Sequence, residues 1–204
     1  MLKKLLLFYR KKLKKFPIKD SQWRLWCKSK KSPKEKEWVI IEAILTQQTN
    51  WRNVEKAMAN LKKERKDSLT SINKLSKSQL AKLIKPSGFY QIKAEYLKNI
   101  ARFFVKNGGI KNLEKLETEI LRRKLLNIKG VGYETADSIL LYVFNRPVFV
   151  VDAYTKRLVG ELKLKIKNLS YNSLQKFFIK IFPRNVSFYQ KFHAIIVLYY
   201  KNKK

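Results

Sequence analysis

Gly130 and Gly132 flank Val131 at a point where one apolar run ends and another begins. Glycine accepts backbone angles that other residues avoid, and it lets another molecule approach the backbone closely. If a helix starts directly after Gly132, successive N–H groups and the helix dipole face an incoming anion. The stretch therefore predicts a phosphate-binding turn to which Lys129 adds charge. A plain corner between two helices would need the same glycines for geometry alone.

One carboxylate, Asp152, follows Gly132 by 20 residues and comes directly after the apolar stretch Val148–Val151. At a helix start, the helix dipole favours the ionised form of a carboxylate. Such a group can stabilise a cationic sugar and orient or deprotonate water. The same position also suits an ordinary helix N-cap. The two roles are compatible, and the residues alone favour the cap.

The net charge narrows the choice of partners. The 204 residues include 47 Lys and Arg against 15 Asp and Glu, which gives a formal charge of +32. Self-repulsion on this scale destabilises a small domain unless a polyanion neutralises it. Nucleic acid is therefore the leading partner, although a lysine-rich proteome would explain part of the excess.

Cysteine and histidine are too scarce for a metal centre. A single cysteine, Cys27, cannot form an internal disulfide, a four-cysteine zinc site or an iron–sulfur site, and it fits a reducing cytoplasm. His193 is the single histidine, and a packed or capping role is expected for it. No cofactor and no metal are expected.

The elements that position these residues are predicted to be helices. Apolar residues recur at helical spacing nearly throughout the chain, so the expected fold class is all-α. The stretch Val148–Val151 is β-like but too short and solitary for a sheet. The basic N-terminus suits a helix packed on the body rather than one lying on a membrane, and no segment is long enough to span a bilayer. The other expected helices cover residues 35–48, 53–63, 76–85, 91–107, 112–128, 135–144, 152–162, 170–182 and 187–201.

Four segments, in this order along the chain, resemble the endonuclease III superfamily of DNA glycosylases: "ILTQQTNWRNV", "KPSGFYQIKAEYL", "LLNIKGVGYETADSILLY" and "VFVVDAYTKRL". The third is similar to the helix-hairpin-helix motif of that superfamily, and the fourth to its catalytic-aspartate segment. The resemblance spans roughly residues 44–158. It implies two helical lobes with the active-site cleft between them, and it makes Asp152 the catalytic carboxylate.

Two departures refine the resemblance. Bifunctional members carry a lysine two places after the second hairpin glycine, and this chain has Glu134 there. The four-cysteine cluster after the last helix is also absent from the sequence. The chain thus looks most like bacterial 3-methyladenine DNA glycosylases of endonuclease III type. The modified lysine that those enzymes can carry shortly after the last-helix histidine has no counterpart after His193.

The resemblance also implies residues that hold DNA. Gln47 and Phe89 occupy positions where the family inserts side chains into the duplex. Trp51 is the residue expected to stack on the flipped base, and Trp23 and Trp26 are the candidates for the opposite side of the base pocket. Core packing is, however, the commoner role of a tryptophan. An alkylated purine is cationic, so it leaves readily and stacks well on an aromatic face. The residues expected to contact the DNA backbone are Lys93, Lys129, Gly130, Val131 and Gly132.

The preferred interpretation is that the protein is a monofunctional DNA glycosylase that removes alkylated purines and leaves an abasic site. A bifunctional glycosylase and abasic-site lyase acting on oxidised bases is the nearest alternative, and a non-catalytic helix-hairpin-helix DNA-binding protein is another. The fourth and least favoured hypothesis is a basic protein that binds a membrane surface. The partner is expected to be double-stranded DNA with damaged bases, bound by a cytoplasmic, nucleoid-associated bacterial monomer without a membrane partner.

The expected lobes follow from the same comparison. The central helical lobe is predicted at residues 45–148, with the helix-hairpin-helix motif at about 120–144. Residues 1–44 and 149–204 are predicted to form the second lobe from both chain ends.

Overall fold

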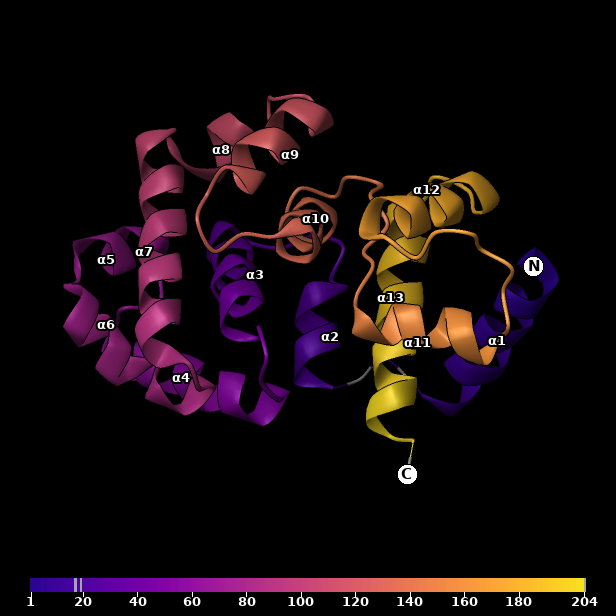
Figure 1. The fold of residues 1–204 in the computed structure, drawn as a ribbon. Coiled ribbons are helices and arrows are strands. Elements are labelled where there is room, and N and C mark those ends of the chain that lie inside the picture. The colour runs from indigo at the N-terminus through magenta and orange to yellow at the C-terminus, as the bar shows by residue number, and fades with distance from the viewer. Residues whose placement is uncertain (17, 19, 204) are drawn as a thin grey trace. The chain divides into compact units, whose positions relative to one another are not determined.

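The structure, a computed structural model, describes residues 1–16, 18 and 20–203. Over these residues it is helical and contains no strand, which confirms the predicted all-α class. The chain divides into two compact units. We call residues 30–139 the central unit, and residues 1–29 with 140–204 the terminal unit. Helix α10 (Tyr133–Tyr142) begins in the first and ends in the second (Figure 1).

In the central unit, helices α5 and α6 pack against the long helix α7, which also contacts α3 (Figure 1). The helices of this unit are α3 (Pro33–Leu45), α4 (Trp51–Lys63), α5 (Leu69–Lys74), α6 (Lys77–Leu83), the 3-10 turn η1 (Lys85–Ser87), α7 (Tyr90–Lys106), α8 (Gly109–Leu113) and α9 (Thr118–Leu126). Three of these, α5, η1 and α8, were not expected. Each is shorter than two turns, so apolar spacing carries too little signal to predict it.

Side-chain caps define where several helices begin. Ser32 and Glu35 form a reciprocal capping box at the start of α3, and Ser76 and Gln79 form another at the start of α6. Each pair satisfies two backbone N–H groups that the helix itself cannot use. The local sequence therefore fixes these helix starts without help from packing.

In the terminal unit, helix α13 packs against both α1 and α11 (Figure 1). The helices that lie wholly in this unit are α1 (Leu2–Lys15), α2 (Ser21–Trp26), α11 (Ala153–Glu161), α12 (Tyr171–Ile181) and α13 (Val186–Lys201). The rings of Phe149 and Phe178 stack with centroids 4.4 Å apart, and Phe192 joins them in the core. The stretch Val148–Val151 runs through this core without forming a strand, and its burial explains why it is apolar.

None of the helices in the described part of the chain is both long and apolar enough to cross a membrane.

Candidate active site and DNA-contact residues

Asp152 caps helix α11 and is 8% exposed. Its Oδ1 accepts hydrogen bonds from the backbone N–H of Thr155, at 2.6 Å, and from the Thr155 hydroxyl, at 2.7 Å. Both bonds go to the same oxygen. The N-cap role is thus present, and it leaves the second oxygen, Oδ2, for other contacts.

His193 and Tyr142 extend from that second oxygen. His193 Nε2 lies 3.6 Å from Asp152 Oδ2, and His193 Nδ1 lies 2.7 Å from the Tyr142 hydroxyl. The same hydroxyl lies 3.3 Å from the Gln190 carbonyl oxygen. Burial acts to raise the pKa of Asp152, but His193 and the Thr155 hydrogen bonds outweigh it and hold that pKa below its usual value. The carboxylate is therefore ionised at neutral pH although it is buried.

Trp23 and Trp26 belong to the same cluster of the terminal unit. The Trp23 ring stands edge-on to His193 with centroids 5.6 Å apart, and the Trp26 ring lies 5.0 Å from that of Tyr142. The two tryptophans are only 1% and 2% exposed, so neither presents an open face to a base in this structure. Trp23 Nε1 is buried and has no hydrogen-bond partner among the described residues.

In the central unit, Gly130 adopts a backbone conformation that requires glycine. Its φ is +98°, and an added Cβ would lie 2.1 Å from Cγ of Tyr96. Val131 is buried and holds the turn on the body of the unit. Gly132 is exposed, and a Cβ there would meet nothing within 4 Å. Of the two glycines, Gly130 serves the fold, and Gly132 leaves the surface open where α10 begins.

Two of the basic side chains around the turn form ion pairs with acidic residues of the protein. Arg122 of α9 makes a bidentate pair with the buried Asp137 of α10, at 2.6 and 2.9 Å. Lys129 pairs with Glu95 at 2.7 Å but stays largely exposed, and that pairing raises the pKa of Lys129. Arg122 therefore ties the two hairpin helices together. Lys129 remains accessible to a phosphate. Giving up its ion pair with Glu95 would cost little stability, because the pair is exposed to solvent.

Gln47 lies just beyond the end of α3 and contacts the hairpin. Its side-chain N–H donates to the Gly130 carbonyl, at 3.0 Å, and to the Thr135 hydroxyl, at 3.1 Å. Gln47 was predicted to insert into a duplex. In this structure it is half-buried and bridges the end of α3 and the hairpin turn at Gly130.

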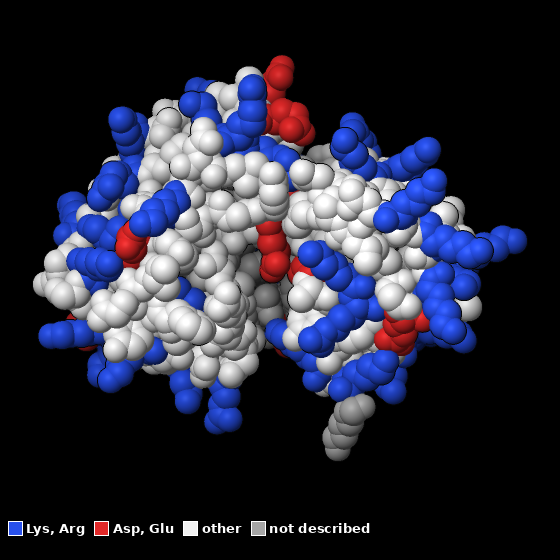
Figure 2. Space-filling view, in the orientation of Figure 1, with Lys and Arg blue, Asp and Glu red and all other residues white. Residues whose placement is uncertain are grey.

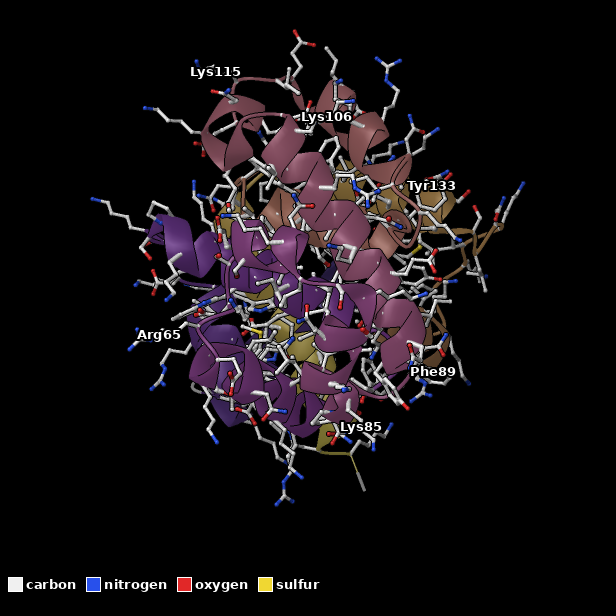
Figure 3. All side chains as sticks on the ribbon, turned by 90° about the vertical axis from the view of Figure 1, so that its left-hand side faces the viewer. Arg65, Lys85, Phe89, Lys106, Lys115 and Tyr133 are labelled. Atoms are coloured by element: carbon white, nitrogen blue, oxygen red, sulfur yellow. The ribbon has the colours of Figure 1, made fainter. Side chains whose placement is uncertain are left out.

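Phe89 precedes α7 in a left-handed conformation, with φ of 45°, and is 63% exposed (Figure 3). A large side chain in this conformation is strained, and an exposed aromatic ring buries little apolar surface in return. Gly88 before it also has a positive φ, of 68°. This turn holds an aromatic side chain out from the surface, which is the geometry an inserting residue needs.

Lys93 occupies a different position from the one predicted. Its side chain is 2% exposed, and its ammonium donates to the backbone carbonyls of Ser87, at 2.7 Å, and Leu45, at 2.8 Å. Burial lowers its pKa to about 8. The position does not favour the predicted phosphate contact, because the ammonium is enclosed and already bonded. Lys93 instead joins the end of α3 to the turn that carries Phe89.

Trp51 is the first residue of α4, directly after the Asn50 cap, and its side chain is half-buried. It therefore keeps more accessible surface than Trp23 or Trp26. The predicted residues thus form two groups. The terminal unit holds Asp152, Trp23 and Trp26; the central unit holds Trp51, Gln47, Phe89, Lys93 and the hairpin.

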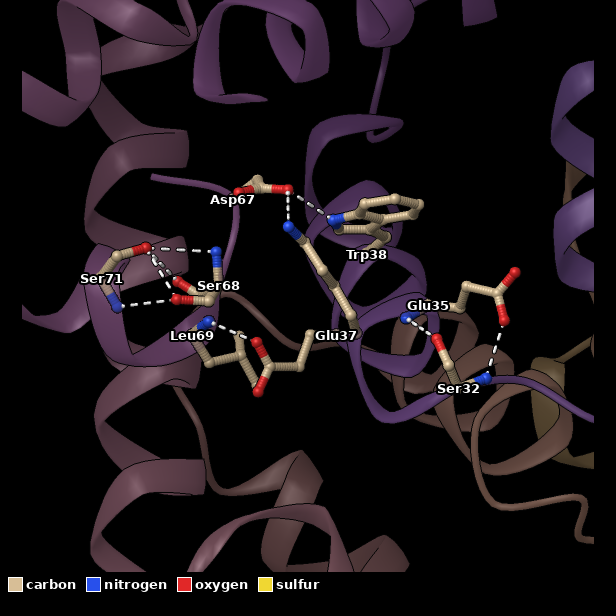
Figure 4. Close-up of polar contacts among 9 residues, drawn as sticks. Ser32, Glu35, Glu37, Trp38, Asp67, Ser68, Leu69 and Ser71 are labelled. Carbon is tan, nitrogen blue, oxygen red and sulfur yellow. Dashed lines mark hydrogen bonds and ion pairs between the residues drawn. The ribbon is translucent and has the colours of Figure 1, made fainter. Parts of the chain in front are cut away.

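A surface cleft of about 710 Å³ lies at the N-terminal end of α3, and none of the predicted site residues lines it. Trp38 forms part of its wall, with Lys62 lying 3.8 Å above the ring centroid. Its two carboxylates are engaged within the protein (Figure 4): Asp67 accepts from Trp38 Nε1 and pairs with Lys34, and Glu37 accepts from the Leu69 N–H. These bonds join α3 to the start of α5.

Lys and Arg side chains cover much of the surface on the face shown in Figure 2, and acidic groups are few. This distribution agrees with the net charge of +32 and suits a polyanionic partner.

The family model of the HhH-GPD superfamily base excision DNA repair proteins matches residues 41–184, which is most of the chain. The chain belongs to this superfamily. It is a DNA glycosylase of base excision repair. The match includes the hairpin, Asp152 and all of α12.

Individual relatives agree with the family assignment. The chain is 45% identical over 164 residues to a protein of Methanocaldococcus jannaschii named "Putative DNA repair glycosylase MJ1434", covering 78% of this chain and 74% of that one. The structure is similar to that of H. pylori 3-methyladenine DNA glycosylase (MagIII) bound to 1,N6-ethenoadenine, with a TM-score of 0.76 and 29% identity over 100% of this chain and 96% of that one.

The M. jannaschii 8-oxoguanine DNA glycosylase shares the fold as well, with a TM-score of 0.67. Its identity is 24% over 98% of this glycosylase and 95% of that chain.

Three residues of the Asp152 cluster acquire their importance only from the structure. Thr155 had a detectable signal, since a threonine three places after an N-cap aspartate sits where the cap bond forms. His193 was expected to pack, and it does, but beside Asp152. Tyr142 had no signal at all, because nothing in its own helix distinguishes it from a core aromatic residue.

Proposed function

We propose that this glycosylase is monofunctional, and that it excises alkylated purines of the 3-methyladenine type from double-stranded DNA to leave an abasic site. The observation that carries the proposal is its likeness to the H. pylori 3-methyladenine glycosylase over its full length. The residue at the lyase-lysine position supports the monofunctional part, since Glu134 is a carboxylate and lies exposed in the first turn of α10.

The proposed reaction needs few groups from the protein. The C1′–N bond breaks with its electron pair leaving on the base, which discharges the cationic purine and leaves an oxocarbenium ion. Asp152 stabilises that cation electrostatically. Water then attacks C1′, and Asp152 Oδ2 or solvent takes the proton. An alkylated purine requires little acid catalysis, so one ionised carboxylate suffices.

The DNA-contact roles follow the geometry of the central unit. Gly132 and the N-terminus of α10 approach a phosphate, with Lys129 beside them. Phe89 enters the base stack, and Trp51 stacks on the extruded base. Gln47 and Lys93 support these parts through their bonds to the hairpin and to the Phe89 turn.

A second candidate function, an abasic-site lyase, has one observation in its favour. Lys201 of α13 lies within electrostatic reach of Asp152, and partial desolvation of its ammonium lowers its pKa although the residue keeps an exposed surface. An amine with a lowered pKa near the reaction centre is the kind of group that forms a Schiff base with an opened sugar. Its Nζ also contacts Gln22 Oε1, at 3.4 Å.

The deciding experiment offers the protein methylated duplex DNA and identifies the released base by mass spectrometry. Release of 3-methyladenine is expected. A parallel reaction on abasic DNA with borohydride distinguishes the two functions, because a trapped covalent adduct, lost in Lys201→Ala, would establish the lyase. Release of 8-oxoguanine alone, from a duplex containing it, would overturn the proposed substrate class.

A further inference from the structure

The Asp152 cluster contains one more functional arrangement, which rests on the proposed role of Asp152. Oδ1 is saturated by the two Thr155 bonds, so Oδ2 is the oxygen that can face a sugar cation or a water molecule. His193 Nε2 lies 3.6 Å from this Oδ2. This separation exceeds a hydrogen bond, and Nε2 has no hydrogen-bond partner among the described residues.

The tautomer of His193 follows from its two neighbours. An unprotonated Nε2 would direct its lone pair at a buried carboxylate, which is repulsive in a medium of low dielectric constant. A proton on Nε2 makes the same contact attractive. In the neutral ring Nδ1 then accepts a hydrogen bond, and the Tyr142 hydroxyl stands 2.7 Å away to donate it.

Tyr142 fits the protonated ring equally well. When His193 is charged, Nδ1 becomes a donor, and the Tyr142 oxygen can accept from it. The phenolic hydrogen then rotates to the Gln190 carbonyl, 3.3 Å away. Burial holds the pKa of Tyr142 well above its ordinary value, so the phenol stays neutral in both cases.

We propose that Tyr142 and His193 are positioning residues for Asp152: they keep a proton on His193 Nε2 facing Oδ2 in both charge states of the ring. The carboxylate thereby stays ionised and correctly aimed while it is buried among aromatic side chains. Neither residue contacts the sugar in this arrangement, since both act through Asp152.

Other ionisable groups face the cluster and enter the interpretation of any pH profile. From α13, Lys201 interacts with Asp152 as well as with Asp20. From the end of α2, Cys27 interacts with Tyr142. None of these groups is bonded to Asp152 in this structure, whereas Thr155 on its own helix is.

The first test reads the ring directly. His193 is the single histidine of the chain, so its imidazole nitrogens give one unambiguous set of 15N resonances. In the folded parent protein at pH 8, the proton is expected on Nε2, with Nδ1 hydrogen-bonded. In Tyr142→Phe the Nδ1 resonance should move toward that of a free unprotonated nitrogen. A proton on Nδ1 and a bare Nε2 in the parent would overturn the proposal.

This readout needs no substrate, so it stands even if the protein releases no alkylated base and the proposed function fails. Activity supplies the second test. Tyr142→Phe should slow single-turnover excision about fivefold to tenfold, the scale of one lost hydrogen bond. It should also move the acid limb of the pH profile to higher pH, because a less well-supported Asp152 has a higher pKa and protonates sooner as the pH falls.

Tyr189→Phe is the matched control. Tyr189 is another buried tyrosine of the terminal unit, and its hydroxyl has no hydrogen-bond partner among the described residues. Removing that hydroxyl should leave both the imidazole spectrum and the pH profile unchanged. Equal losses in Tyr142→Phe and Tyr189→Phe, with no shift of the acid limb in either, would reduce Tyr142 to a packing residue.

Two substitutions of the histidine separate its nitrogens. Glutamine places an amide N–H near the Nε2 position, whereas asparagine places one near Nδ1. His193→Gln is therefore expected to retain more excision than His193→Asn at equal melting temperature. The opposite ranking would show that the contact with Tyr142, rather than the one with Asp152, is what the reaction needs.

Discussion

The Asp152 cluster and the hairpin region meet opposite physical requirements. In the cluster, an ionised carboxylate is buried among aromatic rings and depends on side chains from three separate helices. In the hairpin region, the important features are the backbone conformation at Gly130 and an open surface at Gly132. A reacting group gains strength when water is excluded, whereas a phosphate-binding turn must stay open to its ligand. We therefore expect that substitutions in the Asp152 cluster reduce excision and that substitutions in the hairpin reduce DNA affinity, each without the other.

The largest expected effect comes from Asp152→Asn. Asparagine caps a helix about as well as aspartate, so the melting temperature should hardly change. Excision should fall by a factor on the order of 10²–10³ or more, the scale of losing one electrostatic stabiliser. DNA affinity should hold or rise, since a negative charge has gone. Near-parental single-turnover excision by the folded variant would remove Asp152 from the mechanism.

Trp51→Ala should have the next largest effect. Losing one stacked base costs ~1–3 kcal/mol, and this cost should appear in excision of the alkylated base. Binding to undamaged DNA should barely change, because no base is extruded there. Trp51→Phe keeps an aromatic face and should recover most of the activity. If Trp51→Ala weakens both measurements equally, Trp51 is a core residue.

The two hairpin glycines should respond differently to a side chain. Gly132→Val has room at Cβ and an ordinary backbone, so the protein should fold normally while DNA affinity falls on every sequence. Gly130→Ala forces strain and a clash with Tyr96, and it should destabilise the fold by ~1–3 kcal/mol. Comparing melting temperatures with affinities, and repeating the latter at higher salt, checks both expectations. A Gly132→Val protein with parental affinity would refute the phosphate contact.

The smallest expected effect concerns Lys93 and its dependence on pH. Its pKa falls from 10.5 when unfolded to about 8 when folded, so the unfolded chain binds more protons between these values. The stability of the parent should therefore rise, relative to Lys93→Met, as the pH increases from about 8 to about 10.5. Urea denaturation of both proteins across this range measures the difference. A constant difference would mean that Lys93 is not desolvated.

Lys98→Met provides a control for function. Lys98 also donates to two backbone carbonyls, those of Asn73 and Leu75, but these lie at the C-terminal end of α5 rather than at the Phe89 turn. Both substitutions should cost stability, and only Lys93→Met should weaken DNA binding. Equal binding losses would argue against a special role for the turn that Lys93 holds.

Much of the fold could be predicted because the signals are local. The start of α6 at its Ser76 cap and the break between α9 and α10 at the glycines both depend on residues a few positions apart. The short helices α5 and α8 escaped prediction because they are stabilised by contacts with α7 rather than by their own periodicity.

The sequence by itself determined the family, because the order of short motifs and a net charge of +32 can be recognised without any knowledge of distances. Only the tertiary structure decided which polar groups are paired. The sequence alone predicts that Lys93 is a surface cation, but its buried ammonium donates to the backbone carbonyl of Leu45. The sequence alone predicts that Tyr142 is a core residue, but its hydroxyl also contacts the histidine beside Asp152. The physical reason is that burial changes the charge state and hydrogen-bonding needs of a side chain, and burial depends on residues distant in the chain.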